Sequence, residues 1–148
     1  MLDFTINIAR AADIHTHLSA CDTQFVKILK DRVDLAEYSQ KLVEKATLIE
    51  AWDKELLVGL VAGYHNNPES DKKAYITNVS VLSKWQRQGV AKNLMQRFIK
   101  HVENDRCCSI DLEVVIENHD AQQLYCKLGF FVVARDMQKM KMKLNLGG

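Results

Sequence analysis

The chain has 148 residues, 47% of them hydrophobic and 26% charged, with a formal net charge of +1. These are ordinary values for a globular protein, and there is no repeat or low-complexity tract, which argues against a disordered chain or a solenoid. A chain of this length can bury roughly 70% of its unfolded surface, so we expect residues 1–148 to form a single domain.

Neither a membrane span nor a metal site is indicated. The longest apolar stretch, residues 56–64, is far shorter than the ~20 residues that cross a bilayer. The N-terminus lacks the basic and then apolar pattern of a signal peptide, so we expect a cytoplasmic protein with no membrane partner. The four cysteines show no C-x-x-C spacing and no histidines are paired at ligand distance, so we expect no disulfide framework and no metal cofactor.

The first half of the chain alternates between strand and helix patterns. Residues 4–9 alternate apolar and polar side chains, as a strand does, and Asp13 is placed to cap a following helix. Further helical patterns cover residues 24–29 and 34–46. Strands are then expected at 47–52 and 56–65, joined by a short turn and closed by Asn66-Asn67-Pro68.

The second half continues with a strand over 75–82, an amphipathic helix starting near Val90, and a strand over 109–116. Asn118 is a good N-cap for a helix that ends at Leu128, with Gly129 at the position that often terminates helices. Two last strands follow, and the final one alternates methionine and leucine with Lys139, Lys141 and Lys143. Such a row of lysines is typical of a solvated edge strand.

The junction between the strand at 75–82 and its helix has the character of an anion site. The first amides of a helix lack intrahelical partners, and Gly89 lets the backbone come close to a ligand. From residue 72 to 102 there are seven lysines and arginines and no acidic residue, although the whole chain is only +1, which leaves −6 outside this window. The alternative is an ordinary turn beside a solvated basic helix.

Two motifs around this junction carry a resemblance. The pattern Gln86-x-x-Gly89-x-Ala91 after a strand resembles the first signature of the GNAT superfamily of acyl-CoA-dependent N-acyltransferases. The second signature of the superfamily follows at the expected distance, in Leu112-Glu-Val114, Asn118, Ala121, Leu124-Tyr125 and Leu128-Gly-Phe130. The two motifs cover about residues 75 to 130.

This resemblance implies a fold and a co-substrate. The fold is a mixed α/β arrangement, a largely antiparallel twisted sheet of about seven strands flanked by helices. Its two central strands run parallel and splay apart, and the pantetheine arm of acetyl-CoA enters the gap. The cofactor-binding residues that the resemblance implies are Val79, Val81, Gln86, Arg87, Gln88, Gly89, Val90, Ala91, Lys92 and Asn118.

The resemblance also implies two catalytic residues. Tyr125 occupies the place of the general acid, and a phenol with a pKa near ~10 can donate a proton to a thiolate whose own pKa is near ~8.5. The alternative for Tyr125 is a packed aromatic residue on an apolar helix face. Glu113 matches the base of the branch that acetylates ribosomal-protein N-termini. The alternative for Glu113 is a solvent-facing strand glutamate. The amine could also lose its proton to ordered water, with no dedicated base.

The function that follows is an N-acetyltransferase that moves an acetyl group from acetyl-CoA to a primary amine of a small molecule or peptide, by direct attack in a ternary complex. An acyl-CoA-binding sensor or regulatory subunit with the same fold is the alternative. A nucleic-acid partner is not expected, because stacking aromatics are not interleaved with the basic residues. The edges of such a sheet also allow a homodimer.

Overall fold

The computed structural model describes residues 1–21, 34–65 and 72–147. The helix expected over residues 24–29 and the turn at 66–68 lie outside these ranges. The strands are β1 Asp3–Ile6, β2 Thr47–Asp53, β3 Leu56–Tyr64, β4 Lys73–Val81, β5 Ser109–Val115, β6 Phe131–Arg135 and β7 Lys139–Asn145. The helices are α1 Ala11–Ala20, α3 Leu35–Lys45, the 3-10 turn η1 Ser83–Trp85, α4 Val90–Asn104 and α5 His119–Lys127.

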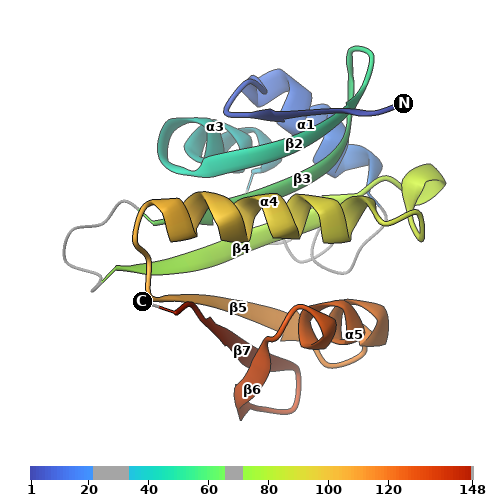
Figure 1. The fold of residues 1–148 in the computed structure, drawn as a ribbon. Coiled ribbons are helices and arrows are strands. Elements are labelled where there is room, and N and C mark those ends of the chain that lie inside the picture. The colour runs from blue at the N-terminus through green and yellow to red at the C-terminus, as the bar shows by residue number, and fades with distance from the viewer. Residues whose placement is uncertain (22–33, 66–71, 148) are drawn as a thin grey trace.

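The seven strands form one sheet in the order β1-β2-β3-β4-β5-β7-β6 (Figure 1). Every neighbouring pair is antiparallel except β4 and β5, which run parallel. This arrangement confirms the mixed, largely antiparallel seven-stranded sheet that the sequence predicts.

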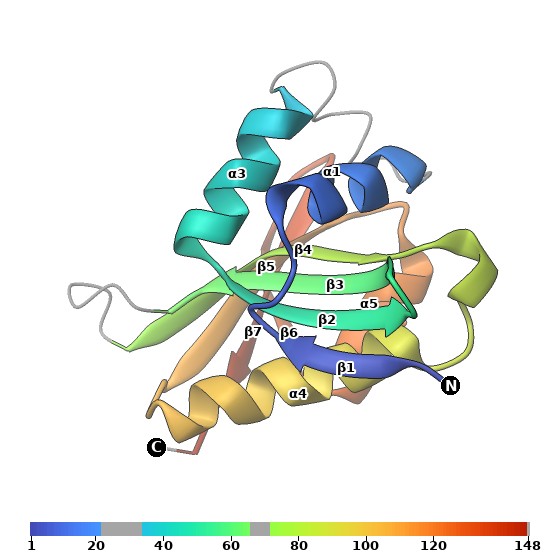
Figure 2. The same cartoon turned by 90° about the horizontal axis from the view of Figure 1, so that it is seen from above.

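Helices cover both faces of the sheet, with α1 and α3 on one side and α4 on the other (Figure 2). The α4 side buries a large core around Phe98, Leu94 and Met95, which α5 joins through Tyr125. A smaller core on the opposite side contains Ile14, Leu18, Leu42 and Leu60. Because side chains alternate along a strand, each strand contributes to both cores.

The parallel pair is joined along only part of its length. Pairing runs from Lys73↔Ser109 to Ile76↔Leu112. Beyond that point β4 continues to Val81 and β5 to Val115 without pairing to each other. The two strand ends therefore diverge on the side where the glycine turn and α5 lie (Figure 1).

Three local predictions are wrong. Helix α1 begins one residue after Arg10, and Asp13 sits inside its first turn, where its carboxylate accepts the Arg10 amide at 3.0 Å, so it is not the N-cap. The first strand ends at Ile6. The Asn7 amide still donates to the Leu48 carbonyl, but the carboxylate of Glu50 accepts the amides of Ile8 and Ala9, the latter at 2.6 Å. The lysine row of β7 is not an edge, since β7 lies between β5 and β6.

None of the helices within the described ranges is both long enough and apolar enough to cross a bilayer.

Candidate active site

The glycine turn opens a space in front of α4. Gly89 has a φ of 81° in the left-handed region, and a Cβ built on it would meet no atom within 4 Å. The first helical hydrogen bond of α4 joins the Asn93 amide to the Gly89 carbonyl at 3.0 Å. The amides of residues 87–92 find no acceptor among the described residues, so they are available to an anion.

The end of β4 presents free backbone groups to the gap beside β5. The Leu82 amide donates to the carbonyl of Val58 in β3 at 2.9 Å, so Leu82 directs its amide toward β3. Hydrogen-bonded pairs alternate along an antiparallel ladder, so the amides and carbonyls of Val79 and Val81 point away from β3. They face the gap where pairing with β5 has ended. The two amides and the Val79 carbonyl are thus directed toward an extended ligand, whereas the Val81 carbonyl accepts from Gln86.

Two glutamines of the turn have different roles. Gln86 donates its side-chain amide to the Val81 carbonyl at 3.0 Å and so ties the turn to the strand end. Gln88 donates to the Lys84 carbonyl at 3.0 Å and is exposed. Gln88 thus stabilises the turn from outside.

Helix α5 closes the far side of the gap. Asn118 caps it, accepting the Ala121 amide at 3.2 Å as predicted. Tyr125 is buried, with 6% of its surface exposed, and packs against Phe130 with ring centroids 5.8 Å apart. Burial raises the pKa of Tyr125 above its usual value, so the phenol is protonated at neutral pH and can act as a proton donor.

These elements enclose a cleft of about 480 Å³. Of the residues predicted from the sequence, the cleft is lined by Val79, Val81, Gln86, Arg87, Gly89, Val90, Ala91, Lys92, Asn118 and Tyr125. Gln88 and Glu113 are not in its lining. Asp120, which the sequence did not single out, is also at the rim, and its carboxylate lies 3.6 Å from the Arg87 guanidinium.

Glu113 lies on the other face of the sheet, because Leu112 and Val114 on either side of it belong to the α4 core. Its carboxylate lies 2.7 Å from the Lys139 ammonium. Burial raises the pKa of the neighbouring Tyr75, and the charge of Glu113 adds to that effect. Glu113 is thus on the face covered by α1 and α3, where the acceptor is expected to enter.

A buried polar network on that face escaped the sequence analysis. His17 of α1 contacts the Leu57 carbonyl through Nδ1 at 2.9 Å, so this nitrogen must donate and Nε2 must accept from the Ser80 hydroxyl at 2.8 Å. Ser80 in turn accepts from the Asn78 side chain at 2.9 Å. No local pattern could reveal the contacts of His17, whose partners lie 40 and 63 positions away in the sequence.

A parallel strand pair opens beside a glycine turn, with a buried tyrosine across the gap, as the resemblance to acyl-CoA-dependent acyltransferases implies. The sequence model described as the acetyltransferase (GNAT) family matches residues 11–130. The chain belongs to this family, and the resemblance stated from the two motifs is confirmed.

Individual relatives agree. The chain is 30% identical over 92 residues to the Drosophila melanogaster protein named "Probable N-acetyltransferase san", a match that covers 62% of this chain and 50% of that protein. The chain therefore spans half the length of this relative.

Two solved structures share the fold. The ribosomal-protein-S18-alanine N-acetyltransferase of Escherichia coli superposes with a TM-score of 0.80 at 17% identity, over 100% of this chain and 97% of the other. The PaiA N-acetyltransferase of Thermoplasma acidophilum in complex with coenzyme A gives a TM-score of 0.76 at 14% identity, over 97% and 99%.

Proposed function

We propose that this acetyltransferase transfers the acetyl group of acetyl-CoA to a primary amine by direct attack in a ternary complex, with Tyr125 as the general acid. The observation that carries the proposal is the cleft itself. Both sequence signatures line it, it has unpaired amides at one end, and a buried phenol lies on the opposite wall. Acetyl-CoA supplies the acetyl thioester when bound.

The residues at the mouth of the cleft fit the phosphates of that co-substrate. The free amides of residues 87–92 and the side chains of Arg87 and Lys92 provide donors and positive charge at a helix N-terminus. Arg87 is paired with Asp120 at 3.6 Å, but both side chains are more than 80% exposed. Such an exposed pair contributes little, so Arg87 can turn to a phosphate at small cost.

At the reacting end, the amide of Val81 donates to the thioester carbonyl and stabilises the negative charge that develops on its oxygen. As the carbon–sulfur bond breaks, Tyr125 donates its phenolic proton to the sulfur and recovers a proton from solvent. Glu113 accepts the proton that the amine loses as the new carbon–nitrogen bond forms, through a water molecule across the gap.

The acceptor enters from the face that carries Glu113, between α3 and the strands. Tyr38 lies near Tyr64 and Tyr75, which face each other across β3 and β4, and the Tyr38 hydroxyl lies 3.3 Å from that of Thr77. These neutral hydroxyl groups suit hydrogen bonding to a polar, uncharged chain such as a peptide backbone. A peptide α-amine is therefore the first acceptor to test.

The test is steady-state turnover with a panel of peptide N-termini, polyamines, amino sugars and amino acids, for the native protein and Tyr125→Phe. We expect kcat to fall tenfold or more in the variant while calorimetry shows unchanged acetyl-CoA affinity. Equal turnover in the two proteins would remove Tyr125 from the reaction. Binding of acetyl-CoA without turnover of any amine would favour a sensor instead.

A further inference from the structure

Three possible metal ligands meet at the C-terminal end of α4, away from the cofactor cleft. His101 lies in the last turn of α4, Asp105 caps it, and His65 directly follows β3. One ligand atom from each side chain lies within 4.8 Å of the other two. Because α4 rises about 1.5 Å per residue, this cluster is roughly 20 Å from the glycine turn.

The His65 ring carries a buried nitrogen without a hydrogen-bond partner. Only 3% of its side chain is exposed, and Nδ1 is one of the buried polar atoms left unsatisfied within the described residues. Its other nitrogen, Nε2, lies 2.7 Å from the hydroxyl of Thr47. When Nε2 donates to Thr47, Nδ1 presents its lone pair to the cluster, which is the usual arrangement of a metal-bound histidine.

The spacing of the cluster agrees with this arrangement. His65 Nδ1 and Asp105 Oδ2 are 3.4 Å apart, too long for a good hydrogen bond. Two ligands of a tetrahedral Zn²⁺, each about 2.1 Å from the metal, are also about 3.4 Å apart. The ring of His101 stands edge-on to that of His65, with centroids 5.4 Å apart, and its ligand nitrogen lies within 4.8 Å of the other two ligand atoms.

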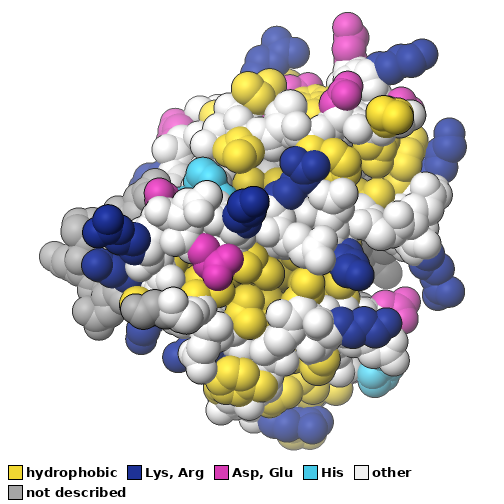
Figure 3. Space-filling model, viewed as in Figure 1, with side chains coloured by type: hydrophobic (Ala, Val, Ile, Leu, Met, Phe, Trp, Pro, Cys, Tyr) yellow, Lys and Arg dark blue, Asp and Glu magenta, His cyan; other side chains and the backbone are white. Residues whose placement is uncertain are grey.

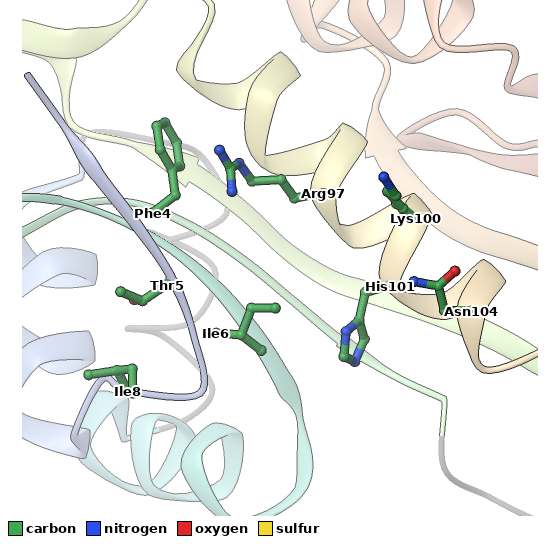
Figure 4. A pocket seen from close by; sticks show the side chains of 8 residues that line it. All are labelled: Phe4, Thr5, Ile6, Ile8, Arg97, Lys100, His101 and Asn104. Atoms are coloured by element: carbon green, nitrogen blue, oxygen red, sulfur yellow. The ribbon is translucent and has the colours of Figure 1, made fainter.

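An ion can reach the cluster from solvent. A cavity of about 570 Å³ between β1 and α4 has His101 in its wall, and Figure 4 shows this ring turned toward the sheet whereas Lys100 points away. Asp105 is itself exposed. The face of the molecule seen in Figure 3 carries scattered lysines and arginines with single acidic side chains between them.

We propose that His65, His101 and Asp105 form a binding site for one divalent transition metal, with Zn²⁺ as the best fit and water completing its coordination. Two imidazoles and one carboxylate suit Zn²⁺, whereas Mg²⁺ and Ca²⁺ prefer oxygen ligands alone. The metal would join the end of β3 to the end of α4 and act as a structural clamp. His65 follows β3, far in sequence from His101 and Asp105, and the pair of ligands at the end of α4 is too small to indicate a metal site in the sequence by itself.

The test is a titration of tag-free, chelator-treated protein with Zn²⁺ in competition with a chromophoric chelator. We expect one ion per chain, and affinity at least tenfold weaker in His101→Gln and in Asp105→Asn. Both side chains are partly or fully exposed, so these variants should fold. Glu103→Gln, an exposed acidic residue in the same helical turn, is the matched control and should bind like the native protein.

Substitution by Co²⁺ distinguishes this site from the exposed thiols of Cys108 and Cys126. Nitrogen and oxygen ligands give visible d–d bands without a thiolate charge-transfer band, and we expect this spectrum to be lost in Asp105→Asn. The proposal is overturned if the native protein binds no stoichiometric Zn²⁺, if both variants bind as tightly as it does, or if binding is lost in Cys108→Ser instead. The readout does not depend on acetyl transfer.

Discussion

The Gln86 side chain donates to the Val81 carbonyl at 3.0 Å, and this single bond couples the glycine turn to the strand end beside the gap. Since the Val81 carbonyl faces away from β3, it would otherwise need a partner from the ligand or from water. Gln86 therefore contributes to the cleft by holding the turn against the strand, which is a positioning role.

Removing this bond should weaken co-substrate binding. In Gln86→Ala we expect KM for acetyl-CoA to rise about fivefold, because an intramolecular hydrogen bond contributes about 1 kcal/mol. Gln88→Ala is the matched control: its side chain bonds the Lys84 carbonyl outside the cleft, so KM should stay within twofold. Equal effects of the two variants in the kinetic assay would contradict the positioning role.

The pair of Glu113 and Lys139 tests the assignment of the base. Glu113→Gln should lower kcat tenfold or more with little change in KM for acetyl-CoA, because Glu113 lies outside the cofactor cleft. Lys139→Met removes the ammonium 2.7 Å away but leaves the carboxylate, so activity should stay within a few-fold of native. Full activity of Glu113→Gln would mean that water alone takes the proton of the amine.

His17 should make the fold sensitive to acid. Burial lowers the pKa of its imidazole from 6.5 to about 4, so between these values the unfolded chain binds more protons than the native protein. The free energy of unfolding should therefore decrease as the pH falls from 6.5 toward 4, by about 2 to 3 kcal/mol from this residue at pH 4.5.

This decrease is measured by urea unfolding at pH 7.5 and pH 4.5. Between the two pH values, the free energy of unfolding of His17→Gln should decrease less than that of the native protein. The difference should be the contribution of about 2 to 3 kcal/mol expected from His17. His15→Gln, an exposed histidine on the same helix, should retain the native pH dependence. An unchanged pH dependence in His17→Gln would show that His17 titrates normally.

Glu50 should stabilise the segment between β1 and α1. It is fully buried, and its carboxylate accepts the amides of Ile8 and Ala9 and the hydroxyl of Thr5. In Glu50→Gln one acceptor is replaced by a donor that faces other donors, so we expect a loss of about 2 to 3 kcal/mol in unfolding free energy. Glu55→Gln, in the exposed turn before β3, should change the stability by less than about 0.5 kcal/mol.

The sequence predicted the order of the described elements because apolar periodicity and turn residues mark them locally. The strand before Gly89, the helix from Val90 and the cap at Asn118 are examples. Two motifs with fixed spacing then predicted that a cleft lies between these elements. What it could not predict depends on long-range contacts. Glu50 accepts hydrogen bonds from amides more than forty positions away, and β7 is not an edge strand because β6 pairs with it.

The same limit applies to the site. Residues of the glycine turn were predicted because backbone geometry at Gly89 is encoded locally. Asp120 near Arg87, and Ser80 with its partner His17, depend on how separate elements dock. Glu113 was assigned by resemblance alone, and its position on the sheet face opposite the α4 core could only come from the register of β5 within the sheet.

The most direct measurement of the central claim is a calorimetric titration with acetyl-CoA and, for comparison, with pantetheine, which lacks the phosphates. We expect saturable binding of acetyl-CoA at one site and much weaker binding of pantetheine. Gly89→Glu should abolish binding, because it adds a negative charge and a strained side chain at a φ of 81°, whereas Gly89→Asn, which tolerates that conformation, should largely retain it. Equal affinity for the two ligands, or native affinity in folded Gly89→Glu, would contradict a phosphate site at this turn.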